Sequence, residues 1–95
     1  MAYDLDIDER VIAYLESPGR LPRPAQVLVF RVLRAELEHD GDRFREEGER
    51  LAPGSSCFWY DLRFEYLGQR YRLSVVVNDE AAPYGVLRVV YAELR

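Results

Sequence analysis

Arginine residues and a tryptophan occur at alternating positions in the second half of the chain. Arg63, Arg70, Arg72 and Arg88 share this spacing with Trp59. Alternate residues of a strand point to the same side, so we expect these side chains to share one face of a sheet. Guanidinium groups bind phosphate through a fork of donors, and an aromatic ring can stack on any base. The spacing therefore predicts a surface that could bind the phosphates and bases of a nucleic acid.

The same positions allow a second interpretation. Asp61 and Glu65 fall on the same face, where Arg63 and Arg72 could form ordinary cross-strand ion pairs with them. Exposed pairs of this kind are common, and each contributes little stability. Spacing alone favours the ion pairs, although an exposed indole such as that of Trp59 usually has a partner.

The charge balance limits the chemistry further. All 13 basic residues are arginine, which excludes a lysine Schiff base, a lysine general base and a phosphate-binding P-loop lysine. The net charge of −4 argues against tight, non-specific binding of nucleic acid. However, residues 1–56 hold 12 of the 17 acidic residues, so the second half is locally neutral.

Length and composition indicate one small domain at residues 1–95, with enough apolar residues (48%) to bury a core. The only cysteine, Cys57, excludes an internal disulfide, and together with the single His39 it cannot supply the usual zinc ligands. No apolar run has the length of a membrane helix, and the first residues lack the basic-then-apolar pattern of a signal segment. We therefore expect a cytoplasmic protein with no metal, no cofactor and no membrane partner.

The first half is expected to hold one strand and two helices. Apolar residues alternating with aspartates predict a strand at 2–7. Asp8 suits the N-cap of a helix at about 9–16. Pro22 and Pro24 suit the first turn of a second helix, which continues through a run without breakers from Ala25 to Leu37. The acidic segment 36–49 is interpreted as a solvated helical face or a frayed extension.

The second half is expected to form a sheet. Alternation predicts strands at 58–66 and 70–77, joined at Gly68-Gln69, and a last strand at 86–94. The order β-α-α-β-β-β indicates an α+β fold, an antiparallel sheet with two helices packed on one face. The side chains expected beneath the helices are apolar: Phe58, Tyr60, Leu62, Leu73, Val75, Leu87 and Val89.

Three segments together resemble the RelE/ParE superfamily, the toxins of bacterial type II toxin–antitoxin systems. They are MAYDLDIDER at the start, CFWYDLR after RLAPGSS, and RYRLSVVVND. The resemblance spans almost the whole chain and has the order of elements that the periodicity predicts. It implies a RelE-like fold and a small cytoplasmic toxin that a cognate antitoxin neutralises by wrapping it.

In the RelE branch the toxin enters the ribosomal A site and cleaves mRNA, with the ribose 2′-OH as nucleophile. The resemblance therefore implies a ribosome-dependent mRNA endoribonuclease, an mRNA interferase that inhibits translation. Its partners would be the ribosome with its mRNA and the antitoxin. Such chemistry needs cations at the phosphate, a base near the 2′-OH and an acid at the leaving oxygen.

The resemblance also assigns roles to single residues. Arg72 corresponds to the central-strand arginine that holds the scissile phosphate. Arg95 corresponds to the arginine at the end of the last strand, and Arg63 to a basic residue of the first hairpin strand. Arg70 and Arg88, on the same face, would contribute to RNA binding.

A YoeB-like branch of the family has an aromatic–Trp pair, which corresponds to Phe58-Trp59, and a glutamate base, which corresponds to Glu49. Trp59 would stack on an RNA base. Glu49 also belongs to the acidic segment, where it could equally be a solvated residue, and its neighbours favour that interpretation.

The chain departs from the family in two respects. The lysines of the RelE prototype fall on Trp59 and Asp61, and the Tyr or His that usually follows the last strand is replaced only by the nearby Tyr84 and Tyr91. These departures and the net charge of −4 support an alternative: a ParE-like inhibitor of DNA gyrase, or a catalytically degenerate member that only binds a partner.

Overall fold

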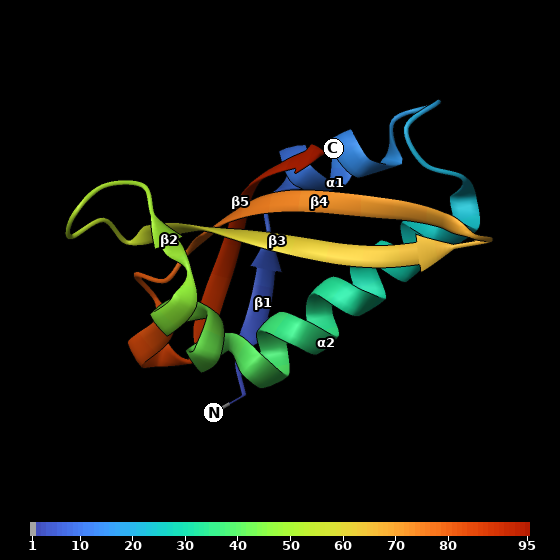
Figure 1. Cartoon of the computed structure of the whole chain (residues 1–95). Coiled ribbons are helices and arrows are strands. Elements are labelled where there is room, and N and C mark those ends of the chain that lie inside the picture. The colour runs from blue at the N-terminus through green and yellow to red at the C-terminus, as the bar shows by residue number, and fades with distance from the viewer. Residues whose placement is uncertain (1) are drawn as a thin grey trace.

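The computed structural model describes residues 2–95 and has an α+β fold with two helices and a five-stranded open sheet (Figure 1). In chain order the elements are β1 (Asp4–Ile7), α1 (Glu9–Glu16), α2 (Arg23–Glu47), β2 (Glu49–Arg50), β3 (Cys57–Tyr66), β4 (Gln69–Asn78), the 3-10 turn η1 (Ala82–Tyr84) and β5 (Val86–Leu94). The strand order across the sheet is β1-β5-β4-β3-β2. Every expected helix and strand is present, and the short strand β2 is an addition.

The sheet is mixed, so the expectation of a wholly antiparallel sheet is wrong. β1 pairs parallel with β5, with Leu5 opposite Leu87, whereas the other neighbouring strands are antiparallel. Apolar residues alternate with polar ones in any strand that has one wet face, whichever way its neighbour runs. The pattern therefore predicted the faces of β1 and left its direction undetermined.

Both helices begin where the sequence predicts, but α2 is longer than expected. The side chain of Asp8 accepts a hydrogen bond from the Arg10 backbone N–H (2.8 Å), which confirms the N-cap of α1. α2 continues through the acidic segment to Glu47, with a kink at Asp40 (φ −114°, ψ 20°). After the kink, Phe44 packs on Tyr60 with 4.1 Å between ring centroids, so apolar contact holds this turn in place. Neither helix within residues 2–95 has the length and apolar character needed to cross a membrane.

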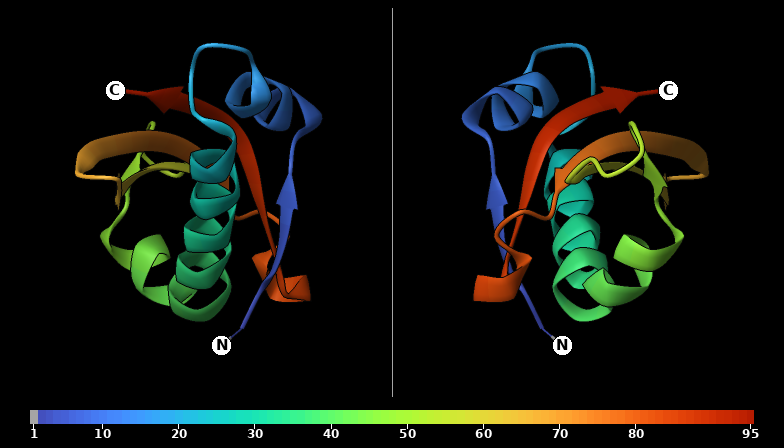
Figure 2. Two further views of the ribbon diagram at one scale, coloured as in Figure 1. Left: turned by 90° about the vertical axis from the view of Figure 1, so that its right-hand side faces the viewer. Right: turned by 90° about the vertical axis from the view of Figure 1, so that its left-hand side faces the viewer.

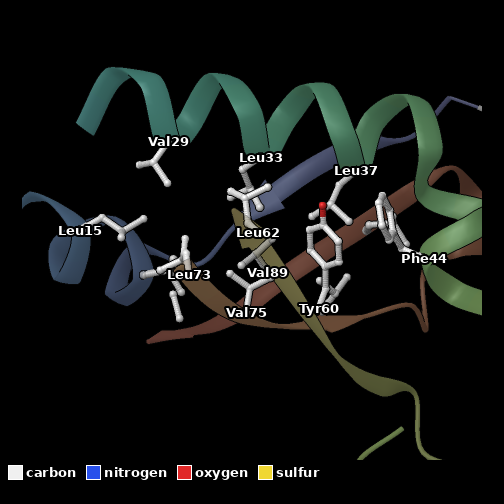
Figure 3. Close-up of a cluster of buried hydrophobic side chains, with 14 of the residues drawn as sticks. Leu15, Val29, Leu33, Leu37, Phe44, Tyr60, Leu62, Leu73, Val75 and Val89 are labelled. Atoms are coloured by element: carbon white, nitrogen blue, oxygen red, sulfur yellow. The ribbon is translucent and has the colours of Figure 1, made fainter. Parts of the chain in front are cut away.

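One core lies between the helices and one face of the sheet. Figure 2 shows α2 running along this face, with β1 to one side of it, the β3–β4 hairpin to the other, and β5 crossing behind it. In Figure 3, Val29, Leu33 and Leu37 of α2 point toward the side chains of the sheet. The predicted apolar residues beneath the helices are all buried: Phe58, Tyr60, Leu62, Leu73, Val75, Leu87 and Val89.

The β3–β4 hairpin turns one residue earlier than Gly68-Gln69. Its two-residue loop is Leu67-Gly68, and both residues have positive φ, 50° and 76°. This is the backbone of a type I′ turn, whose twist matches that of the flanking strands. Gly68 suits this conformation, whereas Leu67 adopts it at a steric cost and is 87% exposed.

Replacing Leu67 by asparagine should stabilise the protein. Asparagine tolerates the left-handed conformation, and no buried contact is lost, so we expect the free energy of unfolding to rise by about 1 kcal/mol. Urea unfolding followed by circular dichroism measures the change. Gly68→Ala is the matched control and should lower stability, because alanine is strained at a φ of 76°. A decrease for Leu67→Asn would contradict this account of the turn.

Candidate nucleic-acid interface on the open face of the sheet

Side chains from four strands meet on the open face, the side of the sheet that the helices do not cover. In one row across the sheet, Trp59 of β3 lies opposite Glu49 of β2 and Val76 of β4, and Val76 lies opposite Tyr91 of β5. In a second row, Arg63 lies opposite Arg72. β5 ends beside this row, because the backbone N–H of Arg95 donates to the Arg72 carbonyl oxygen (2.8 Å).

Two clefts adjoin each other on this face. The larger cleft, of about 620 Å³, lies at the hairpin end and is lined by Arg63, Phe64, Glu65, Arg70, Tyr71, Arg72 and Arg95. The smaller cleft, of about 320 Å³, is lined by Glu49, Trp59, Asp61, Arg72, Ser74 and Arg95. Arg72 and Arg95 line both clefts and therefore stand at their junction.

Three of the four arginines of the larger cleft form no ion pair among residues 2–95, whereas Arg95 lies 3.5 Å from Glu93. None of the ion pairs formed among residues 2–95 involves Arg63, Arg70 or Arg72, so the interpretation that Arg63 and Arg72 form cross-strand ion pairs is wrong. The reason is the register, which places Arg63 directly opposite Arg72. Like charges directly opposite each other in a sheet destabilise it. The open face thus carries an electrostatic cost that a bound anion would relieve.

Trp59, which lines the smaller cleft, packs against Tyr91 outside it. The rings of Trp59 and Tyr91 meet edge to face, with centroids 5.9 Å apart, and Val76 lies between these two residues in the register. Val76 is 5% exposed although it points away from the core, so the two rings shield it. The Trp59 indole is thereby held in place while part of it stays open to a ligand.

A hydrogen-bonded chain links the two clefts. Ser74 Oγ donates to Asp61 Oδ1 (2.6 Å) and accepts from Arg95 Nε (3.0 Å). Arg95 Nη2 also lies 3.5 Å from Glu93 Oε2. Asp61 is therefore engaged with Ser74 and is not a partner of Arg63 or Arg72.

Glu49 reaches the smaller cleft because β2 pairs with β3 at Trp59. The chain turns into β2 at Gly48, where a Cβ atom would lie 2.6 Å from the Phe44 carbonyl oxygen and closer still to the Phe58 ring. Only glycine fits this close approach of α2 to β3. Glu49 therefore lies in the sheet and not on a solvated helical face.

A buried carboxylate, that of Asp79, holds β2 in place. Asp79, which is 9% exposed, accepts hydrogen bonds from Arg50 Nη2 (2.8 Å) and Arg45 Nε (3.0 Å). Burial alone would raise the pKa of Asp79, but the bonds from Arg50 and Arg45 outweigh burial and hold this pKa below its usual value. Arg50 also lies over the Phe58 ring, 4.9 Å from its centroid. This network anchors the strand that carries Glu49.

Most of the sequence-predicted site residues come together, and one does not. Glu49, Trp59, Arg63, Arg70, Arg72 and Arg95 all line one or both clefts. Arg88 lies on the same face but next to β1, where its Nε is 3.4 Å from Asp6 Oδ2, and it lines neither cleft.

Sequence reasoning assigned no role to Ser74, named Tyr91 only as a tyrosine near the last strand, and missed the Asp79 network. The alternation of β4 placed Ser74 on the polar side, but a lone serine gives no signal without its partners. No group of three or more His, Cys, Asp or Glu side chains among the described residues is arranged to hold a metal ion.

Comparisons of this chain with models of protein families, with curated proteins and with solved structures found no match in any of the three.

Proposed function

We propose that this protein is a cytoplasmic toxin of a type II toxin–antitoxin system, with a RelE-like fold, and that it cleaves mRNA on the ribosome. The observation that carries the proposal is the uncompensated arginine cluster at the junction of two clefts. Arg63, Arg70 and Arg72 have no ion-pair partner in residues 2–95, and Arg95 stands beside Arg72. An anion such as RNA phosphate is the ligand that this charge arrangement favours.

The groups around the junction suit cleavage of RNA by its own 2′-hydroxyl. Glu49 would take the proton from the ribose 2′-OH, and the oxygen would then attack the adjacent phosphorus. Arg72 and Arg95 would stabilise the added negative charge on the phosphate. The bond to the 5′-oxygen of the next nucleotide would break, leaving a 2′,3′-cyclic phosphate and a 5′-hydroxyl. Trp59, across from Glu49, would stack on a neighbouring base.

One observation favours the alternative of a ParE-like gyrase inhibitor or a partner-binding module without catalysis. The described residues that line the smaller cleft include no histidine, lysine or tyrosine to protonate the leaving oxygen. Under the leading proposal this proton would come from water. Under the alternative, the same arginines would bind an acidic surface of a partner and no RNA would be cut.

Controlled expression of the protein in a bacterium tests the proposal. We expect growth to stop and translated mRNAs to carry new ends with 2′,3′-cyclic phosphates. Normal growth with intact mRNA, while soluble protein accumulates, would refute it. A DNA-damage response without cut mRNA would favour gyrase as the target, and no phenotype at all would favour the partner-binding module.

The proposed antitoxin has two surfaces available. β2 pairs only with Trp59 and Phe58, so the rest of β3 keeps a free edge to which a strand could be added. The arginine clefts suit acidic side chains of the same partner. Co-purification of the product of a neighbouring short open reading frame would identify this partner.

A further inference from the structure

We propose that Ser74 is a positioning residue, backed by Asp61, that holds the guanidinium of Arg95 in the orientation needed to bind a phosphate. The inference deepens the proposed function and rests on it for the identity of the ligand. Ser74 is one of the few polar side chains buried in the sheet, at 2% exposure. Its position at the floor of the smaller cleft brings it under Arg95.

The direction of the hydrogen bonds shows how Ser74 acts. A serine hydroxyl has one proton, and here that proton goes to Asp61 Oδ1 at 2.6 Å. A lone pair of the hydroxyl oxygen therefore faces Arg95 Nε, 3.0 Å away. The carboxylate of Asp61 makes the hydroxyl a better acceptor, because successive hydrogen bonds polarise one another in a buried setting. Ser74 is almost fully buried, and this shielding from water favours the bond from the Arg95 Nε–H.

The contacts of Arg95 leave one edge of its guanidinium free. Nε is bound by Ser74, and Nη2 lies 3.5 Å from Glu93 Oε2. The Nε–H and one Nη2–H lie along the same edge of a guanidinium, so Ser74 and Glu93 both occupy that edge. The opposite edge, formed by Nη1 and the second Nη2–H, remains available for two parallel bonds to phosphate oxygens.

The backbone places Arg95 beside Arg72. The Arg95 N–H donates to the Arg72 carbonyl oxygen, so the two residues are cross-strand neighbours on the open face. Arg95 is fixed by its partners, whereas Arg72 has no side-chain partner among residues 2–95 and can adjust to the ligand. The arrangement also gives a role to the Asp61 carboxylate, which lies among arginines. Asp61 accepts the hydrogen bond from Ser74 and leaves the charges of Arg63 and Arg72 uncompensated.

A first experiment uses the protein without RNA. We expect the Arg95 Nε–H to give a resolved NMR signal with slow exchange against water, unlike the free side chains of Arg63 and Arg70. Ser74→Val should abolish this protection. Ser74→Thr, whose side chain has the shape of valine but carries a hydroxyl group, should retain it. Asp61→Ala, a change at an exposed position, should weaken the protection without a risk to folding. An unprotected Arg95 signal in the native protein would overturn the proposal.

A second experiment tests the coupling of Ser74 to Arg95 in ligand binding. The dissociation constant for a labelled single-stranded RNA is measured for Ser74→Ala, Arg95→Ala and the double variant. We expect Ser74→Ala to weaken binding about 10-fold, and to have no further effect once Arg95 is alanine. The same loss in both backgrounds would mean that Ser74 acts through general stability, and would overturn the proposal.

The two experiments separate this inference from the proposed function. If the native protein binds no RNA but Arg95 is protected in a Ser74-dependent manner, the proposed function fails and the positioning role stands. If RNA binds and is cut while Arg95 is unprotected, the positioning role fails and the proposed function stands.

Discussion

Replacing Arg72 by alanine is expected to lower the rate of mRNA cleavage by about 100-fold to 1,000-fold and to abolish toxicity. Arg72 lines both clefts, beside Arg95, and has no side-chain partner among the described residues. Removing a single preorganised donor to a developing negative charge has an effect of this size in other enzymes. Growth after induction and cleavage in a cell-free translation reaction measure the loss.

The same substitution should leave the fold intact. Arg72 is exposed and faces Arg63 directly across the hairpin, so its removal relieves a repulsion between like charges. We expect the free energy of unfolding to stay unchanged or to rise by a few tenths of a kcal/mol, roughly the value of one cross-strand pair. Activity would then be lost without a loss of stability. A large loss of stability would show that Arg72 has a structural role instead.

Arg88→Ala is the matched control for Arg72→Ala. Both changes remove one arginine from the open face, and both alter the net charge equally. Arg88, however, lies outside the two clefts and is paired with Asp6. We expect Arg88→Ala to keep nearly native cleavage. Equal losses for the two variants would indicate a general effect of charge and would contradict a site at the junction of the clefts.

Replacing Asp79 by alanine should have the largest effect on stability. Its carboxylate binds Arg45 and Arg50, which come from α2 and β2, and it is almost fully buried. Without it, two neighbouring guanidiniums lose their common partner while still partly shielded from water. We expect the free energy of unfolding to fall by about 3 kcal/mol. Because Arg50 lies in β2 next to Glu49, hydrogen exchange of the β2 amides should also become faster.

Asp6→Ala is the control for this second change. Asp6 also pairs with an arginine, Arg88, but both side chains are more than half exposed. Such a surface pair contributes about 0.5 kcal/mol or less. Urea unfolding of the two variants should therefore differ clearly, and equal losses would contradict the role given to burial.

The contribution of Asp79 should depend on pH in one direction. Its pKa in the folded protein lies below the ordinary value of 3.8, because the bonds to Arg50 and Arg45 outweigh the effect of burial. A group with a lowered folded-state pKa stabilises the protein above its unfolded-state pKa, and this stabilisation is lost as pH falls through the folded-state pKa. The stability difference between the native protein and Asp79→Ala should thus be constant from neutral pH to about pH 5. It should shrink at lower pH, and growth of the difference in acid would contradict this assignment.

The sequence by itself determined which side of β3 and β4 is wet. Alternation in these two strands was sufficient to place Trp59, Arg63 and Arg72 on the face opposite the core. The sequence also determined where α1 begins, because Asp8 caps the first turn by accepting a hydrogen bond from Arg10, two residues along the chain. These features depend on residues close together in sequence, so local patterns contain the information.

Register was decided by the tertiary structure. Moving the hairpin loop from Gly68-Gln69 to Leu67-Gly68 keeps every side chain on its face but shifts each cross-strand partner by two residues. Arg72 therefore faces Arg63, while Glu65 lies opposite Arg70 instead of Arg72, so Arg63 and Arg72 are left without an acidic residue directly opposite them. Alternation has a period of two and cannot detect a shift of two.

Contacts between distant segments were likewise beyond the sequence pattern. Glu49 joins the site because β2 adds to β3, and β2 is held by Asp79, far along the chain. Ser74 and Arg95 meet only because β5 lies beside β4. The sequence determined the face and the residue types of the candidate site, whereas only the packed sheet decided which charges are neutralised and which remain free for a ligand.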